Sequence, residues 1–177
     1  SNHRSEFWAD VSNQTLMAAD IWEGVEKLKQ GMHVGLTVLV NRYDGIDLPD
    51  NACRLLVIDG LPEVQSHLDR VDAIALDGTE AELSRHVQRI EQGMGRGVRS
   101  NDDHCVVILM GPRLVRRLHN PDARRKFTPG TLSQLNLSRE VTKQVKGQTL
   151  DQLKDVIDFS LTQEAKWVSA RKKAVVG

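Results

Sequence analysis

The chain has 177 residues, which suits one domain with a hydrophobic core and a small additional part. Its 24 lysines and arginines balance its 24 aspartates and glutamates, which excludes a polyanion-binding surface spread over the whole molecule and leaves only a local one. No apolar run approaches the roughly 20 residues of a membrane span, and no signal peptide is visible.

The two cysteines indicate a cytoplasmic protein. Cys53 and Cys105 lie in apolar or strand-like runs, where we expect buried reduced thiols rather than a disulfide. The chain has no initiator methionine, and Ser1-Asn2 is typical of a tag-cleavage remnant. Residues 1–12 are therefore expected to hold this remnant and the start of the domain, and the chain to be excised from a longer protein.

Helices and apolar strands alternate along the next part of the chain. A helix is predicted for residues 13–29, because apolar side chains recur along it and a glycine follows as a stop. Strands are predicted for residues 36–40, 55–58 and 105–110, and their unbroken apolar runs are typical of strands buried on both faces. A further helix is predicted around residues 64–71. This alternation predicts an α/β fold with a mostly parallel sheet.

A polar loop at residues 41–49 follows the first of these strands. Polar residues directly after a buried strand are expected at the ligand edge of an open α/β sheet. The Asp-Gly pair within the loop, followed shortly by Leu-Pro, marks a turn. An ordinary connecting loop is the alternative interpretation.

The most informative stretch, residues 88–99, lies in a helix expected to begin after Thr79. That residue is a predicted N-cap, and Glu82 completes a capping-box pattern with it. One amide, one glycine and two arginines then recur at i, i+3, i+4 and i+7, which places them on one helical face. These residues are Gln92, Gly95, Arg96 and Arg99.

This face is suited to binding an anion. Each guanidinium presents a planar fork of donors that matches phosphate oxygens, and a glycine lets a ligand approach the backbone. The alternative is a frayed helix end with a solvated basic tip, because each of the three glycines in the stretch costs about 1 kcal/mol inside a helix.

The pattern Gln92-x-x-Gly95-Arg96-x-x-Arg99 resembles motif VI, QxxGRxxR, of superfamily-two helicases, and the wider stretch resembles the DinG/XPD-like branch of the DEAD/DEAH-type enzymes. The loop Gly45-Ile46-Asp47 is similar to their motif V. The resemblance covers nearly all of the chain. It implies the second RecA-like motor domain, with helices flanking a mostly parallel sheet. The sequence contains no GxxxxGK[ST] and no Asp-Glu box, so this domain has no P-loop of its own.

The resemblance also implies roles for individual residues. Two arginines would stabilise the charge on the γ-phosphoryl group of ATP, and an amide would orient the nucleotide or its water. The loop would approach the nucleotide, contact its ribose or support motif VI. The implied catalytic residues are Gln92, Arg96 and Arg99, the nucleotide-binding residues Gly45, Asp47 and Gly95, and the nucleic-acid-binding residues Asn41, Arg42 and Tyr43.

The implied cofactors are ATP and Mg²⁺, both held mainly by a first RecA-like domain outside this chain. The implied partners are that domain and single-stranded or duplex nucleic acid, with DNA favoured over RNA and DNA repair as a setting; no membrane is involved. A metal site at residues 102–105 is rejected, because adjacent residues of a strand point to opposite faces and no second ligand cluster follows.

The last third of the chain is expected to be helical. The basic stretch at residues 113–126 is interpreted as the solvated face of a short helix in preference to a phosphate-binding surface. Helices are predicted for residues 131–146 and 149–170, with a break at Gly147 and with Trp167 as a core residue rather than a base-stacking platform. The domain core is thus predicted at residues 13–130, and residues 131–177 are expected to pack on it.

The favoured hypothesis is the C-terminal motor domain of an ATP-dependent helicase, inactive as an isolated chain. A RecA-like module that binds nucleic acid or protein without catalysis is one alternative, although it has no evident need for two arginines. An unrelated doubly wound enzyme that holds a phosphorylated metabolite with Arg96 and Arg99 is another, and it leaves the Gly45-x-Asp47 loop unexplained.

Overall fold

A computed structural model describes residues 2–32, 35–40, 46–61, 71, 74–97 and 104–176. The chain divides into two compact units, Ser1–Ala123 and Arg124–Gly177, which are described separately. In the first unit the elements are α1 (Asn2–Trp8), β1 (Gln14–Leu16), α2 (Asp20–Lys29), β2 (Thr37–Leu39), η1 (Asp50–Ala52), β3 (Leu55–Asp59), α4 (Glu80–Met94), η2 (Gly95–Gly97), β4 (Val106–Met110) and α5 (Pro112–His119), with α6 (Pro121–Arg124) at the boundary.

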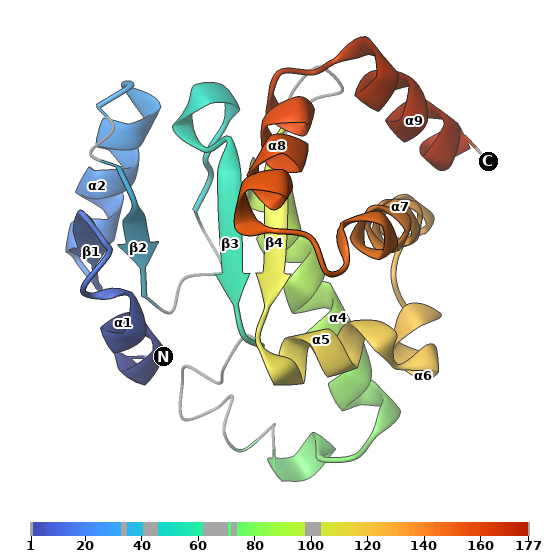
Figure 1. Cartoon of the computed structure of the whole chain (residues 1–177). Coiled ribbons are helices and arrows are strands. Elements are labelled where there is room, and N and C mark those ends of the chain that lie inside the picture. The colour runs from blue at the N-terminus through green and yellow to red at the C-terminus, as the bar shows by residue number, and fades with distance from the viewer. Residues whose placement is uncertain are drawn as a thin grey trace. The chain divides into compact units, whose positions relative to one another are not determined.

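The described strands form two parallel pairs, shown as arrows in Figure 1. In the first pair Gln14 lies opposite Thr37, and in the second pair Leu55 lies opposite Val106. The three strands predicted from apolar runs are confirmed as β2, β3 and β4. Short parallel sheets flanked by helices confirm the predicted α/β class. The helix predicted around residues 64–71 lies almost wholly outside the described residues.

The helix predicted for residues 13–29 is wrong in its first half, because residues 14–16 form β1 and the helix begins only at Asp20. The amide oxygen of Asn13 accepts a hydrogen bond from the backbone N–H of Leu36 at 2.8 Å, and the Asn13 backbone N–H donates to the Leu36 carbonyl at 2.9 Å. These contacts align β1 with β2, and the sheet hydrogen bonds outweigh the local helical pattern.

The burial predicted for the strands is also wrong. All residues of β2 and β4 are only half-buried, and in β3 only Ile58 is buried, while Leu55 is 46% exposed. In the described part of the chain, each strand of these two-stranded sheets has one edge without a neighbouring strand. The unbroken apolar runs therefore lie beside space that these two pairs do not fill.

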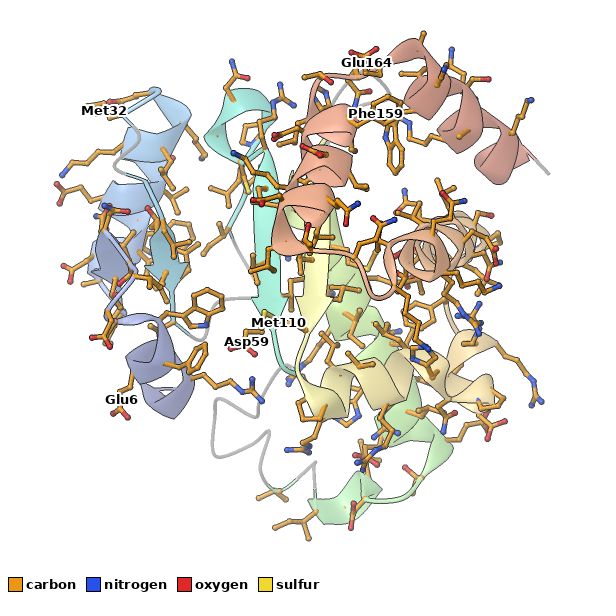
Figure 2. All side chains as sticks on the ribbon, viewed as in Figure 1. Glu6, Met32, Asp59, Met110, Phe159 and Glu164 are labelled. Carbon is orange, nitrogen blue, oxygen red and sulfur yellow. The ribbon has the colours of Figure 1, made fainter. Side chains whose placement is uncertain are left out.

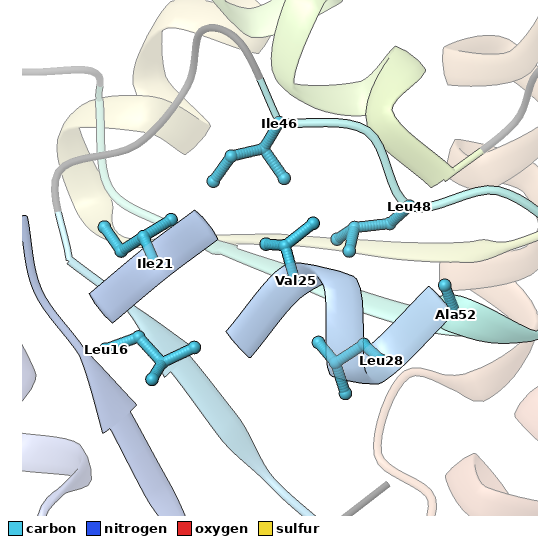
Figure 3. Packing of buried hydrophobic residues seen from close by; sticks show 7 residues of the cluster. All are labelled: Leu16, Ile21, Val25, Leu28, Ile46, Leu48 and Ala52. Carbon is cyan, nitrogen blue, oxygen red and sulfur yellow. The ribbon is translucent and has the colours of Figure 1, made fainter. Parts of the chain in front are cut away.

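A core cluster forms where α2 packs against the loop that follows β2. Figure 3 shows this cluster, in which Ile46 and Leu48 extend from the loop toward the apolar face of α2. Both loop residues are almost fully buried, at 2% and 4% exposure. Burial of side chains of this size contributes roughly 1.5–3 kcal/mol each, which fixes the loop on the helix. The cluster consists of Leu16, Ile21, Val25, Leu28, Ile46, Leu48 and Ala52.

The first turn of α4 is capped by the residue that the sequence predicted. The Thr79 hydroxyl accepts a hydrogen bond from the Glu82 backbone N–H at 3.2 Å, so the predicted N-cap is confirmed. The Glu82 carboxylate accepts from the Gly78 backbone N–H at 3.1 Å rather than from the N-cap residue, so the second half of the box is displaced by one residue. Three apolar side chains at helical spacing bury one face of α4: Leu83, Val87 and Ile90.

The second unit contains α7 (Pro129–Val145), α8 (Leu150–Leu161) and α9 (Ala165–Val176). The predicted break at Gly147 is confirmed, with a φ of +80° there. The helix predicted for residues 149–170 is instead two helices, because Gln163 has a φ of +51° and its backbone N–H bonds back to Ser160. Trp167 is half-buried and meets Phe159 edge to face, with ring centroids 6.4 Å apart. Within the described chain, no helix is long and apolar enough to cross a membrane.

Candidate functional site

The glycine–arginine stretch lies where α4 ends. The α-helix continues to Met94, and the backbone N–H of Gly95 caps it by bonding to carbonyl oxygens of the last turn. Residues 95–97 then form the 3₁₀ turn η2. A 3₁₀ turn has 3.0 residues per turn instead of 3.6. The α-helix therefore ends at Met94, and Arg96 lies in the tighter turn that follows it.

Arg96 joins this turn to the loop after β2. Its Nη1 donates a hydrogen bond to the carbonyl oxygen of Ile46 at 3.1 Å. Its own carbonyl oxygen accepts a hydrogen bond from the backbone N–H of Leu48, also at 3.1 Å. The side chain and the backbone of one arginine thus hold the residues on both sides of Asp47, and the two stretches singled out by the sequence lie together.

Asp47 is held in place by its neighbours. Because Ile46 and Leu48 are buried in the core cluster, the intervening aspartate is the residue of this segment that remains half-buried. Asp47 also makes a further interaction of its own.

Gln92 and Gly95 are both exposed, within one turn of Arg96. A Cβ added at Gly95 would have no atom within 4 Å, so a ligand can reach this backbone without displacing a side chain. Five other predicted site residues lie outside the described residues: Asn41, Arg42, Tyr43, Gly45 and Arg99.

A second polar cluster lies at the carboxyl end of β3, at the position of Asp59 in Figure 2. The Asp59 carboxylate forms an ion pair with the Arg4 guanidinium and accepts a hydrogen bond from Trp8 Nε1 at 3.1 Å. Arg4 also covers the glycine turn beyond the strand, because a Cβ at Gly60 would lie 2.9 Å from the guanidinium carbon.

The sequence interpretation missed this cluster, because it assigned residues 1–12 to a tag remnant and the start of the domain. One signal was present in the chain. An Asp-Gly pair, Asp59-Gly60, lies where the apolar run of β3 ends.

The basic stretch at residues 113–126 includes α5, α6 and the residues after them. Arg113 and Arg116 are exposed. Arg117 is half-buried and approaches Glu82 of α4, with 3.8 Å between Nη2 and Oε1. The same carboxylate lies 3.6 Å from His86 Nδ1. Burial is the main cause that lowers the pKa of His86, the nearby Arg117 lowers it further, and Glu82 opposes both.

The described residues contain no group of three His, Cys, Asp or Glu side chains arranged to hold a metal ion. The polar groups gathered at the Arg96 turn are instead a guanidinium, a half-buried carboxylate and an accessible glycine backbone. A guanidinium and an accessible backbone are groups that can bind an anion.

Fold and site together define a parallel α/β domain. In this domain the glycine–arginine turn at residues 95–97 is hydrogen-bonded to the polar loop that follows β2. A family model described as the helicase C-terminal domain matches residues 2–129 of the chain. The chain therefore belongs to the helicase C-terminal domain family, and the resemblance found in the sequence is confirmed. Comparison with curated proteins and with solved structures gave no significant match.

Proposed function

We propose that this chain is the C-terminal motor domain of an ATP-dependent nucleic-acid helicase and that it supplies arginines to ATP hydrolysis in a cleft completed by a first RecA-like domain. The observation that carries the proposal is the pair of hydrogen bonds between Arg96 and the residues on either side of Asp47. These bonds connect the turn at residues 95–97, which we propose to contact the nucleotide phosphates, with a loop at the ligand edge of the sheet.

The proposed chemistry is electrostatic. Phosphoryl transfer spreads negative charge over the γ-phosphoryl oxygens, and an inserted guanidinium stabilises that charge. Arg99 would be the main finger, with Arg96 beside it. The exposed Gln92 would orient the nucleotide or its water, and the accessible backbone at Gly95 would let the nucleotide approach.

Arg96 has a second role in this proposal, as a positioning residue. Its guanidinium is already hydrogen-bonded to the Ile46 carbonyl. A movement of the arginine toward a phosphate group would therefore displace the loop that contains Asp47. Binding of ATP would close the two domains around the nucleotide, and hydrolysis would open them. The loop residues Asn41, Arg42 and Tyr43 would transmit this motion to the nucleic acid.

ATP and Mg²⁺ would be held mainly by the first domain. When bound, they supply the phosphoryl group and the positive charge that neutralises its oxygens. The residues described here fit a supporting role, because they offer guanidinium and backbone donors rather than a carboxylate cluster for a metal. DNA as the favoured nucleic acid, DNA repair and a cytoplasmic location belong to the same proposal.

The test uses the full-length protein with Arg99→Ala, Arg99→Lys and a control, Arg116→Ala, at an exposed arginine of α5. We expect Arg99→Ala to lower ATP turnover by roughly 10³-fold or more, with a smaller change in ATP affinity. Lysine should restore little, because it lacks the planar fork of donors. The control should keep its basal ATP turnover without nucleic acid.

The alternative functions give different results in the same assay. Near-normal turnover in Arg99→Ala would refute the arginine-finger assignment. A module that only binds nucleic acid would show no ATP turnover in the unmodified protein, and an enzyme acting on a phosphorylated metabolite would have no P-loop elsewhere in its polypeptide. The full-length gene sequence settles that last point directly.

A further inference from the structure

The polar cluster around Asp59 lies beside two glycine turns. At the carboxyl ends of β3 and β4, Asp59 is paired with Met110, and Figure 2 labels both residues. Each strand then turns at a glycine, with a φ of +92° at Gly60 and +98° at Gly111. The two turns are in contact, because a Cβ added at Gly111 would lie 3.2 Å from the Cα of Gly60. A ligand that crosses the ends of these strands would therefore meet bare backbone.

Positive charge borders this backbone. The guanidinium of Arg4 lies beside both turns, since its Nη1 would be 3.4 Å from a Cβ at Gly111 and its carbon 2.9 Å from one at Gly60. Arg113 follows two residues after Gly111 and is exposed in the first turn of α5. The helix α5 contains three arginines and no acidic residue. In a chain with equal numbers of basic and acidic residues, this is a local excess of positive charge.

An exposed aromatic side chain accompanies Arg4. Phe7 follows three residues later in α1, so the two share one face of that helix. Phe7 is 76% exposed, and its ring meets Trp8 edge to face, with ring centroids 5.8 Å apart. Single-stranded nucleic acid is bound by this combination of groups, because its bases stack on aromatic rings while its phosphates contact cations.

The Asp59 carboxylate would oppose such binding. It forms the ion pair with Arg4 and accepts the hydrogen bond from Trp8 Nε1 at 3.1 Å. The Arg4 side chain is 34% exposed, so a ligand in solvent can reach the guanidinium. Carboxylate and phosphate oxygens are alternative acceptors for the same fork of donors. A phosphate that reaches Arg4 must therefore compete with Asp59, which Trp8 continues to hold in place.

We propose that Arg4, Phe7 and Arg113 bind a single strand of nucleic acid across the two glycine turns, and that Asp59 competes with the strand for Arg4 and so weakens binding. On binding, Arg4 exchanges the carboxylate for a phosphate, a base stacks on Phe7, and Arg113 contacts a second phosphate. On release, Asp59 pairs with Arg4 again. The inference rests on the proposed function, because a motor has to release its strand in every cycle.

A purely structural role is the competing interpretation, in which the ion pair only attaches α1 to β3. The two interpretations predict effects of opposite sign. If the pair is only structural, loss of the charge on Asp59 loosens α1 and does not raise the affinity for nucleic acid. If Asp59 is a competitor, the same change raises it. Asp59→Asn is the decisive variant, because it keeps the size of the side chain and an acceptor for Trp8 Nε1.

The test is binding of a labelled oligonucleotide to the full-length protein without ATP, measured by fluorescence anisotropy. Single-stranded DNA and RNA of equal length are compared, and the one bound more tightly identifies the strand. We expect Asp59→Asn to bind roughly twofold to fivefold more tightly, which is the effect of one partly exposed ion pair. Phe7→Ala should bind about tenfold less tightly, because it removes the stacking ring.

A salt titration tests the phosphate contact of Arg113. Arg113→Gln should reduce the slope of log affinity against log salt concentration by about 0.7, the value for one contact to a single strand. Arg139→Gln removes an exposed arginine of α7 and is the matched control, for which we expect an unchanged slope. Equal slopes in the Arg113→Gln variant and the unmodified protein would remove this residue from the proposed surface.

Combined variants identify the group for which Asp59 competes. Arg4→Gln should weaken binding and should abolish the gain caused by Asp59→Asn. A gain that persists without Arg4, or an Asp59→Asn variant that binds no more tightly than the unmodified protein, would overturn the proposal. If Arg4→Gln does not fold, as judged by circular dichroism, Asp59→Asn decides alone.

The outcome is separable from that of the proposed function, because these measurements contain no ATP. Loss of ATP turnover in Arg99→Ala, together with unchanged binding in the Arg4, Phe7 and Asp59 variants, would overturn this inference alone. An unmodified protein that binds neither DNA nor RNA would contradict both.

Discussion

The Nη1 atom of Arg96 lies 3.1 Å from the carbonyl oxygen of Ile46, and this hydrogen bond connects residues 50 positions apart in the sequence. Ile46 is buried against α2, so the arginine is attached to the core and not only to a surface loop. Any movement of the guanidinium is therefore transmitted to the segment containing Asp47. The following predictions use this connection and the contacts around α4.

Asp47→Ala should weaken both basal ATP turnover and its stimulation by nucleic acid in the full-length protein. Asp47 lies between the two residues that Arg96 holds. In the proposed function its carboxylate contacts the nucleotide or supports motif VI, and one hydrogen bond to a charged group is worth about 1.5–3 kcal/mol. That cost corresponds to a decrease of roughly ten- to a hundredfold. Asp47→Asn, which keeps the size and one acceptor, should lose less. Steady-state ATPase assays with and without single-stranded DNA measure both effects, and an unchanged rate together with an unchanged stimulation ratio would make the loop a scaffold only.

The purified 177-residue chain should show no ATP turnover. An arginine finger adds to a phosphate cradle and a metal that already hold the nucleotide, and the sequence contains no GxxxxGK[ST] motif. The experiment is an ATPase assay on this chain with and without single-stranded DNA. Turnover that survives Arg96→Ala combined with Arg99→Ala would show that the chain carries its own catalytic site, and the motor-domain proposal would have to be abandoned.

Thr79→Ala should destabilise the first unit by about 1 kcal/mol. The Thr79 hydroxyl accepts the Glu82 backbone N–H at 3.2 Å and satisfies one of the unpaired donors at the start of α4. Thr79→Ser keeps the hydroxyl and is the matched control, with a change of only a few tenths of a kcal/mol expected. Urea unfolding followed by circular dichroism measures the difference. Equal losses in both variants would show that the methyl group, not the cap, stabilises this position.

Stability should fall as the pH is lowered through about 6.5, the usual pKa of histidine. The pKa of His86 is lowered in the folded protein, so between the folded and unfolded pKa values the unfolded chain binds more protons and acid favours unfolding. Below the folded pKa this contribution becomes constant. The charged groups around the ring are Glu82, Arg89, Arg113 and Arg117.

His86→Gln tests this assignment. Thermal unfolding measured between pH values of about 5 and 8, on either side of the histidine range, should show a shallower dependence in the variant than in the unmodified protein. Arg117→Gln, which removes a nearby positive charge that lowers the pKa, should shift the midpoint of the dependence upward. Identical pH profiles for the unmodified protein and His86→Gln would exclude His86 as the cause.

Local signals in the sequence predicted much of this fold. Apolar runs located β2, β3 and β4, and the hydroxyl of Thr79 located the start of α4. Each of these features depends on residues that are close together in the chain. The strand β1 could not be found in this way, because it has three residues and is held by contacts between Asn13 and Leu36.

The candidate site was predictable in its residues more than in its geometry. The pattern that contains Arg96 identified the family, which the family model confirms. The change from α-helix to a 3₁₀ turn at Gly95 has no periodic signal in the sequence. The contact between Arg4 and Asp59 left no periodic signal, since it joins a helix at one end of the chain to a strand end 55 positions away.

The order in which the chain folds follows from these separations. Arg96 and Ile46 are 50 positions apart, and Arg54 and the carbonyl of His104, beside the start of β4, are also 50 apart, whereas Arg124 and Asn136 in the second unit are only 12 apart. Contacts that close long loops carry a larger entropic cost and form more slowly than local ones. We therefore expect the helices of the second unit to form early and the arginine turn to reach its loop late. A newly synthesised chain would acquire its secondary structure well before it acquires its candidate site.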